Sequence, residues 1–148
     1  MSGERKTQLR FVLDASVAIR WALADGSAAD LRYADQVLGS LTSSRAVVPH
    51  LWYTEMAHVL GGAARRGLMS GEQCAAALLR INGLPIASDE ANPLFTQADV
   101  VRLMLELNTS GYDSQYLEVA TRLRLPLATL DLDLRKASKK LGISLYLG

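Results

Sequence analysis

The stretch RFVLDAS, from Arg10 to Ser16, indicates the fold class. Its apolar residues do not alternate with polar ones, which is typical of a parallel strand covered on both faces. We predict this strand over Phe11–Asp14, so that it ends in a carboxylate. The run LPLATL (125–130) is a second strand of this kind, and Asp131 follows it directly. Two acids therefore stand at the ends of strands that are expected to lie in the core.

Helical segments separate the predicted strands. Further strands are expected over RAVVP (45–49), LPIA (84–87) and ISLYL (143–147). Helix starts are predicted at Ser27, near His50, at Ser70, at Thr96, near Asp113 and at Leu134. Strands that alternate with helices need crossover connections, so we expect a three-layer α/β/α fold with a central parallel sheet. Ligands bind at the carboxyl ends of strands in such sheets, where Asp14 and Asp131 are expected.

Length and composition limit the function classes. The 148 residues suit one domain over 1–148, with a polar extension at residues 1–9. A net charge of +1 excludes a global basic field, so contact with nucleic acid must come from a local patch. The lone cysteine, Cys74, the polar start and the lack of a long apolar run favour a cytoplasmic protein without a membrane span.

Two further acids lie on apolar helix faces. Glu55 has Leu51 four residues before it and Val59 four residues after it. Asp113 shares its face with Leu117 and other apolar residues. A solvated acid avoids the apolar stripe of a helix that packs on a sheet, so Glu55 and Asp113 are candidates for a functional site.

Four carboxylates directed at one region repel each other unless a cation lies between them. Oxygen donors without a histidine or cysteine cluster favour Mg²⁺, or Mn²⁺ in its place, over zinc. Such a metal orients a phosphate, stabilises developing charge and lowers the pKa of an attacking water. The four acids therefore predict phosphodiester hydrolysis.

Each acid also has a structural explanation. Asp14, Asp113 and Asp131 could each cap the helix that follows it. Glu55 could pair with Arg65 or Arg66. The capping explanation does not extend to Glu55, because this residue does not stand at a helix start.

The motifs VLDASVAI, PHLWYTEMAHVL, GYDSQYLEVATRLRLPLATLD and DLDLRKASKKLGI occur in this order and resemble the PIN domain. More narrowly, they resemble the VapC-type toxins of toxin–antitoxin pairs. The resemblance runs from about Arg10 to Leu147. It implies a three-layer α/β/α fold and a divalent-metal-dependent endoribonuclease that leaves a 5′-phosphate and a 3′-hydroxyl. It also implies a cognate antitoxin and a homodimer.

The resemblance assigns residues by their motifs. Asp14, Glu55, Asp113 and Asp131 match the acidic residues of the family, as catalytic and metal-binding groups, and Ser16 and Thr129 match its auxiliary hydroxyls. Asp133 is expected to be auxiliary or merely solvated, because Leu127, Thr129 and Asp131 share one strand face and Asp133 falls in the turn beyond. There it could accept hydrogen bonds from free N–H groups at the start of the last helix. His58 departs from the family pattern, which has asparagine there, and the polar extension is a second departure.

Two other functions remain open. The pair Asp131 and Asp133 could be the DxD motif of a phosphatase, although that motif should follow the first strand of its domain. The chain could also be a non-catalytic PIN-like binding module. A homodimer is further suggested by the apolar helical residues Trp21, Leu31, Tyr33 and Leu38, which are more than a short chain obviously needs inside.

Overall fold

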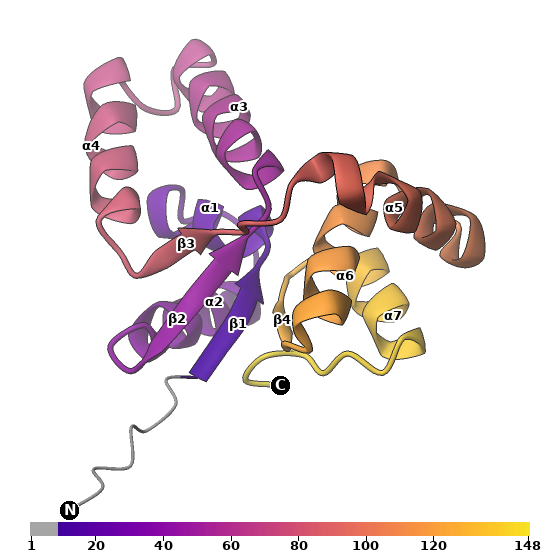
Figure 1. The fold of residues 1–148 in the computed structure, drawn as a ribbon. Coiled ribbons are helices and arrows are strands. Elements are labelled where there is room, and N and C mark those ends of the chain that lie inside the picture. Colours follow the sequence, from indigo (N-terminus) through magenta and orange to yellow (C-terminus); the bar gives the residue numbers. More distant parts are fainter. Residues whose placement is uncertain (1–8) are drawn as a thin grey trace, which may run out of the picture.

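The computed structural model describes residues 9–148 and has a parallel sheet at its centre (Figure 1). The four strands lie in the order β3-β2-β1-β4. Their bounds are β1 Leu9–Leu13, β2 Ser44–Val48, β3 Ile86–Ser88 and β4 Leu127–Ala128. β1 pairs with β2 on one side and with β4 on the other, which explains why Phe11, Val12 and Leu13 are fully buried without alternation.

Residues 9–148 form seven helices, which cover both faces of the sheet in three layers (Figure 1). They are α1 Ala15–Ala22, α2 Ala28–Ser40, α3 Leu51–Arg65, α4 Gly71–Asn82, α5 Pro93–Leu107, α6 Gly111–Leu123 and α7 Leu132–Lys140. The predicted fold class is therefore confirmed. Within this part of the chain, no helix is both long and apolar enough to cross a bilayer.

Three strand predictions need correction. The first strand starts at Leu9 rather than Phe11, inside the predicted extension, of which residues 1–8 lie outside the described part. β4 has only two residues, so Asp131 lies three residues beyond its end. ISLYL is not a regular strand, because only Leu145 pairs, with Leu127. Backbone hydrogen bonds between Leu127 and the carbonyl of Ser144 and the N–H of Tyr146 hold this segment, and the Tyr146 ring stacks on Phe11 with centroids 3.8 Å apart.

Capping residues set the helix starts. The predicted capping box of α4 is confirmed, with hydrogen bonds exchanged between Ser70 and Gln73. α5 begins three residues before the predicted Thr96, because Asn92 accepts a hydrogen bond from the Leu94 N–H and Pro93 suits the first helical position. α6 begins at Gly111 rather than near Asp113, because Ser110 caps it.

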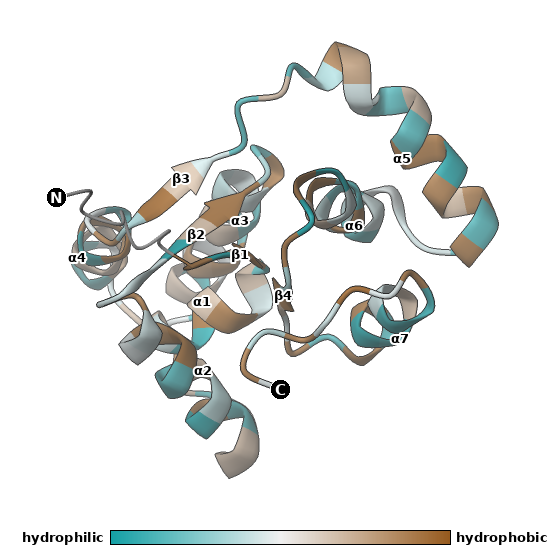
Figure 2. Cartoon of the chain, turned by 60° about the horizontal axis from the view of Figure 1, so that its bottom comes forward, coloured by the Kyte–Doolittle hydropathy of each residue, from teal (hydrophilic) through white to brown (hydrophobic). Residues whose placement is uncertain are grey.

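Most of the apolar residues of α1 and α2 that were expected to form a surface for a partner pack inside this chain. Trp21, Tyr33 and Leu38 pack against the core. The Trp21 indole donates to the Ala34 carbonyl at 2.9 Å, and the Tyr33 hydroxyl donates to the Tyr146 carbonyl at 2.7 Å. Among the described residues, α5 carries more exposed large apolar side chains than any other helix, and Figure 2 shows its brown segments at the edge of the molecule.

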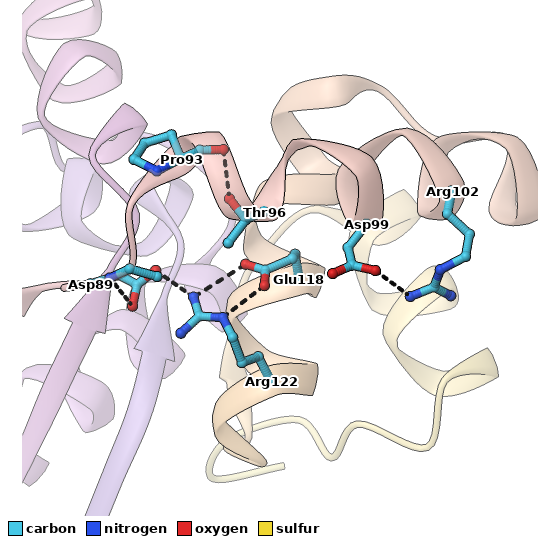
Figure 3. A network of polar contacts seen from close by, with 8 residues as sticks. Asp89, Pro93, Thr96, Asp99, Arg102, Glu118 and Arg122 are labelled. Carbon is cyan, nitrogen blue, oxygen red and sulfur yellow. Dashed lines mark hydrogen bonds and ion pairs between the residues drawn. The ribbon is translucent and has the colours of Figure 1, made fainter.

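An arginine network ties α6 to the loop before α5 (Figure 3). Arg122 of α6 pairs with Asp89, just after β3, and with Glu118 one turn earlier in α6. Both carboxylate side chains are largely buried, with 11% and 7% of their surface exposed. This network holds α6 beside the sheet and so fixes where its first turn, which carries Asp113, can lie.

Candidate metal centre at the carboxyl edge of the sheet

Asp14 follows β1 and is the most buried of the four predicted acids, with 6% of its surface exposed. Its Oδ2 accepts hydrogen bonds from the Ser16 hydroxyl at 2.6 Å and the Thr129 hydroxyl at 2.7 Å. Asp14 occupies the cap position of α1, but its side chain makes no capping hydrogen bond. Capping therefore does not explain why a carboxylate is buried here.

Burial raises the pKa of Asp14, and the negative charge of Asp131 raises it further. The hydrogen bonds from Ser16 and Thr129 oppose these effects, because hydroxyl donors favour the ionised form. The two hydroxyls thus serve to keep a charge in a place where water cannot solvate it well.

Glu55 lies on α3 and is half-buried. Its Oε1 accepts a hydrogen bond from the Tyr116 hydroxyl at 2.7 Å. Burial raises the pKa of Glu55, and the charges of Asp14 and Asp113 add to the rise. Arg65 and Arg66 stand at the opposite end of α3 and take part in none of the ion pairs of residues 9–148, so the proposed pairing with Glu55 is wrong.

Asp113 lies in the first turn of α6. The Ser110 hydroxyl caps this helix by accepting from the Asp113 backbone N–H at 3.0 Å, so the Asp113 carboxylate is not needed as a cap. Burial raises the pKa of Asp113 to about 6, with further contributions from the charges of Asp131, Asp14 and Asp133.

Asp131 is the helix cap that the structural explanation anticipated. Its Oδ1 accepts from the Leu134 N–H at 2.9 Å at the start of α7. Its own backbone N–H donates to the Thr129 hydroxyl at 3.0 Å, so Thr129 contacts both acids. Asp133 lies exposed inside the first turn of α7, as expected for a solvated acid, and Asp131 rather than Asp133 caps this helix.

The four acids and Asp133 belong to one electrostatic cluster, because negative charges within this group raise the pKa values of Asp14, Glu55 and Asp113. They come from four places in the chain: the end of β1, α3, α6 and the start of α7. A sequence model of the PIN domain matches residues 11–140, and this match includes all of them. The chain belongs to the PIN domain family.

A solved structure agrees with this membership. The Pyrobaculum aerophilum protein PAE2754 is similar to this chain with a TM-score of 0.66 and 22% sequence identity. The similarity covers 87% of this chain and 86% of the other, and at this identity it concerns the fold alone. No curated protein matches the chain in sequence. PIN domains are usually metal-dependent nucleases.

The donor chemistry of this PIN domain fits a hard divalent cation. Burial and the charges of neighbouring acids raise the pKa values of Asp14, Glu55 and Asp113, which is the condition that a bound cation relieves. Within residues 9–148, however, no three His, Cys, Asp or Glu side chains lie close enough to form a ready-made metal cage. Mg²⁺ keeps several waters and uses few direct carboxylates, so a loose arrangement suits it better than it would suit zinc.

Two residues at this PIN-domain site were not predicted. Tyr116 orients Glu55, and its place three residues after Asp113 on the same helix face is a usable sequence signal. Arg135 donates to the Thr129 carbonyl at 2.8 Å and lies over the Tyr33 ring at 5.2 Å. Nothing in the local sequence distinguishes Arg135 from the other basic residues of α7.

Proposed function

We propose that this PIN domain is a divalent-metal-dependent endoribonuclease and the toxin of a toxin–antitoxin pair. The observation that carries the proposal is Asp14, a buried carboxylate that receives two hydroxyl hydrogen bonds and lies within electrostatic reach of Asp131 and Glu55. A cluster of carboxylates without a bound cation destabilises the folded protein, so its presence indicates a functional site that binds a cation.

The chain's own residues have distinct proposed roles. Asp14, Asp113 and Asp131 would hold Mg²⁺ or Mn²⁺, and Glu55, oriented by Tyr116, would complete the negative site. Ser16 and Thr129 would keep Asp14 ionised and aimed. A bound divalent ion would supply charge stabilisation at the phosphate and lower the pKa of the attacking water.

The test is cleavage of single-stranded RNA with Mg²⁺ or Mn²⁺. EDTA should abolish cleavage, and Asp14→Asn should reduce its rate by ~10²-fold or more, as expected when charge stabilisation in the transition state is lost. Glu106→Gln is the matched control, because Glu106 is an acid on α5 that pairs with Arg102 outside the cluster. Products should carry a 5′-phosphate. Full cleavage in excess EDTA, or a 2′,3′-cyclic phosphate, would contradict the proposal.

The alternative of a non-catalytic binding module makes a different prediction. A scaffold without a metal site should bind Mn²⁺ no better than a variant that lacks all four acids, which calorimetry measures directly. The phosphatase alternative is not favoured, because the DxD pair follows β4, the last strand of the sheet, whereas Asp14 follows the first.

The toxin role implies partners. We propose a homodimer and a small antitoxin, and the exposed apolar side chains of α5 support a protein contact there; they are Leu94, Phe95, Val101 and Leu105. The unpaired Cys74 suits a cytoplasmic location. Expression of the chain alone should arrest growth, and expression of Asp14→Asn should not. Light scattering that reports a monomer at high concentration would contradict the homodimer.

A further inference from the structure

A polar cavity of about 470 Å³ adjoins the acidic cluster. It lies between the turn that joins α5 to α6 and the exposed side of α7. Asp113 and Asp133 line it from one side, and Lys136 and Lys140 of α7 line it as well. Two acids of the cluster and two lysines therefore share one hollow.

The two lysines form a pair on one helix face. Lys136 and Lys140 are four residues apart in α7, so their side chains project in nearly the same direction. Both are exposed. None of the ion pairs found in residues 9–148 includes either lysine, although Asp113 and Asp133 line the same cavity. The ammonium groups are thus not held in ion pairs by the acids that line the same cavity.

The position of Lys140 in the last turn of α7 has a simple structural explanation, because cations there stabilise the helix dipole, but Lys136 lies in the middle of the helix. That explanation applies equally to Lys139, in the last turn. Lys139 is exposed but is not among the residues that line the cavity. Lys136 and Lys140 therefore share a place in the cavity that Lys139 lacks. Stabilisation of the helix end does not distinguish the three lysines in this way.

We infer that Lys136 and Lys140 together bind a backbone phosphate of single-stranded RNA next to the phosphate that is cleaved. This inference rests on the proposed function. Ammonium groups are compact point charges that bind phosphates without reading bases. A phosphate in this cavity would lie beside Asp113, and the RNA chain would then run on over the acidic cluster. The lysines would position the substrate and would contribute no specificity for sequence.

The test uses the salt dependence of RNA binding. In the Asp14→Asn background, in which cleavage should be slower by ~10²-fold or more, the affinity for a short single-stranded oligoribonucleotide is measured in EDTA over a range of salt concentrations. Each phosphate contact contributes about 0.7 to the slope of log K against log salt for single strands. The double change Lys136→Gln and Lys140→Gln should reduce the slope by about 0.7, as expected for one lost phosphate. Lys139→Gln should leave the slope unchanged.

The outcomes separate this inference from the proposed function. The inference is overturned if the double variant binds RNA with an unchanged slope. It is also overturned if Lys139→Gln lowers the slope as much as the double variant does. Failure of the Asp14→Asn protein to bind RNA at any salt concentration overturns both proposals together. Thermal melting of each variant checks that the fold is intact. Because the three lysines are exposed, their replacement should leave the melting temperature unchanged.

Discussion

The Thr129 hydroxyl lies 2.7 Å from the Asp14 carboxylate, although 115 residues separate the two in the chain. The contact joins the end of β1 to the segment that follows β4, and the Asp14 backbone N–H donates to the Ala128 carbonyl beside it at 2.9 Å. Since Thr129 also accepts from the Asp131 N–H, one hydroxyl sets the relative position of two acids.

Replacement of Thr129 by valine should destabilise the fold. The change removes a donor from the buried Asp14 carboxylate, which should cost about 1–3 kcal/mol, and it also removes an acceptor from the Asp131 N–H. It should also raise the pKa of Asp14 further, because a hydrogen bond to the ionised form is lost. Urea unfolding measures the loss. Thr129→Ser keeps the hydroxyl and should retain most of the stability, and equal losses in both variants would show that the methyl group matters instead.

The metal-free protein should lose stability as pH rises from about 4 to about 6. Burial, with the charges of neighbouring acids, raises the pKa of Asp113 to about 6 in the folded state, whereas an unfolded aspartate titrates near 3.9. The folded state therefore binds the proton more tightly, and its advantage disappears as pH passes through the folded pKa. The raised pKa values of Asp14 and Glu55 act in the same direction.

Asp113→Asn should therefore melt at a higher temperature than the unmodified protein in EDTA at neutral pH. The same variant should lose stabilisation by Mn²⁺, which in the unmodified protein should be larger above pH 6 than below it, because protons compete with the metal. Asp35→Asn, an exposed position of α2, is the control and should change neither property. A lower melting temperature for Asp113→Asn in EDTA would contradict the repulsion argument.

Asp131 and Asp133 should respond differently to replacement by asparagine and alanine. Asp131→Asn keeps a side-chain oxygen for the Leu134 N–H, so it should preserve the α7 cap while reducing the cleavage rate by ~10²-fold or more. Asp131→Ala should also cost about 0.5–2 kcal/mol of stability through the lost cap.

Asp133→Asn should affect the cleavage rate much less and should lower the pKa of Asp113, because it removes a nearby negative charge. NMR titration of the Asp113 carboxyl group measures that pKa. A larger loss of rate in Asp133→Asn than in Asp131→Asn would reverse the proposed roles of the two acids.

Loss of Arg122 should destabilise the contact between α6 and the sheet edge. Arg122→Ala leaves Asp89 and Glu118 largely buried without a cation (Figure 3). Breaking a buried ion pair costs about 3–5 kcal/mol, and we expect about 2–3 kcal/mol because 33% of the Arg122 side chain is exposed to water. Arg102→Ala is the matched control, since Arg102 pairs with Asp99 and Glu106 on the exposed side of α5. Its urea midpoint should stay unchanged, and an equal shift in both variants would contradict the argument.

The order of the elements was predictable because it depends on local patterns. The apolar run at Phe11–Leu13, the capping box at Ser70 and the apolar stripe of α5 each express a physical preference of a short segment. Element ends were less predictable. Asn92, Ser110 and Asp131 compete with nearby polar residues as caps, and β4 is short because only Leu127 and Ala128 pair with β1.

The sequence by itself determined which residue types the chain brings to its sheet edge: carboxylates after two strands and on two apolar helix faces. Only the tertiary structure decided what each one contacts. The Thr129 hydroxyl on Asp14, the tyrosine that orients Glu55 and the place of Asp131 beside Asp14 all depend on contacts between segments that are remote in the chain. Local preferences carry no information about such contacts, because the packing of helices on the sheet sets the distances between segments that are remote in the chain.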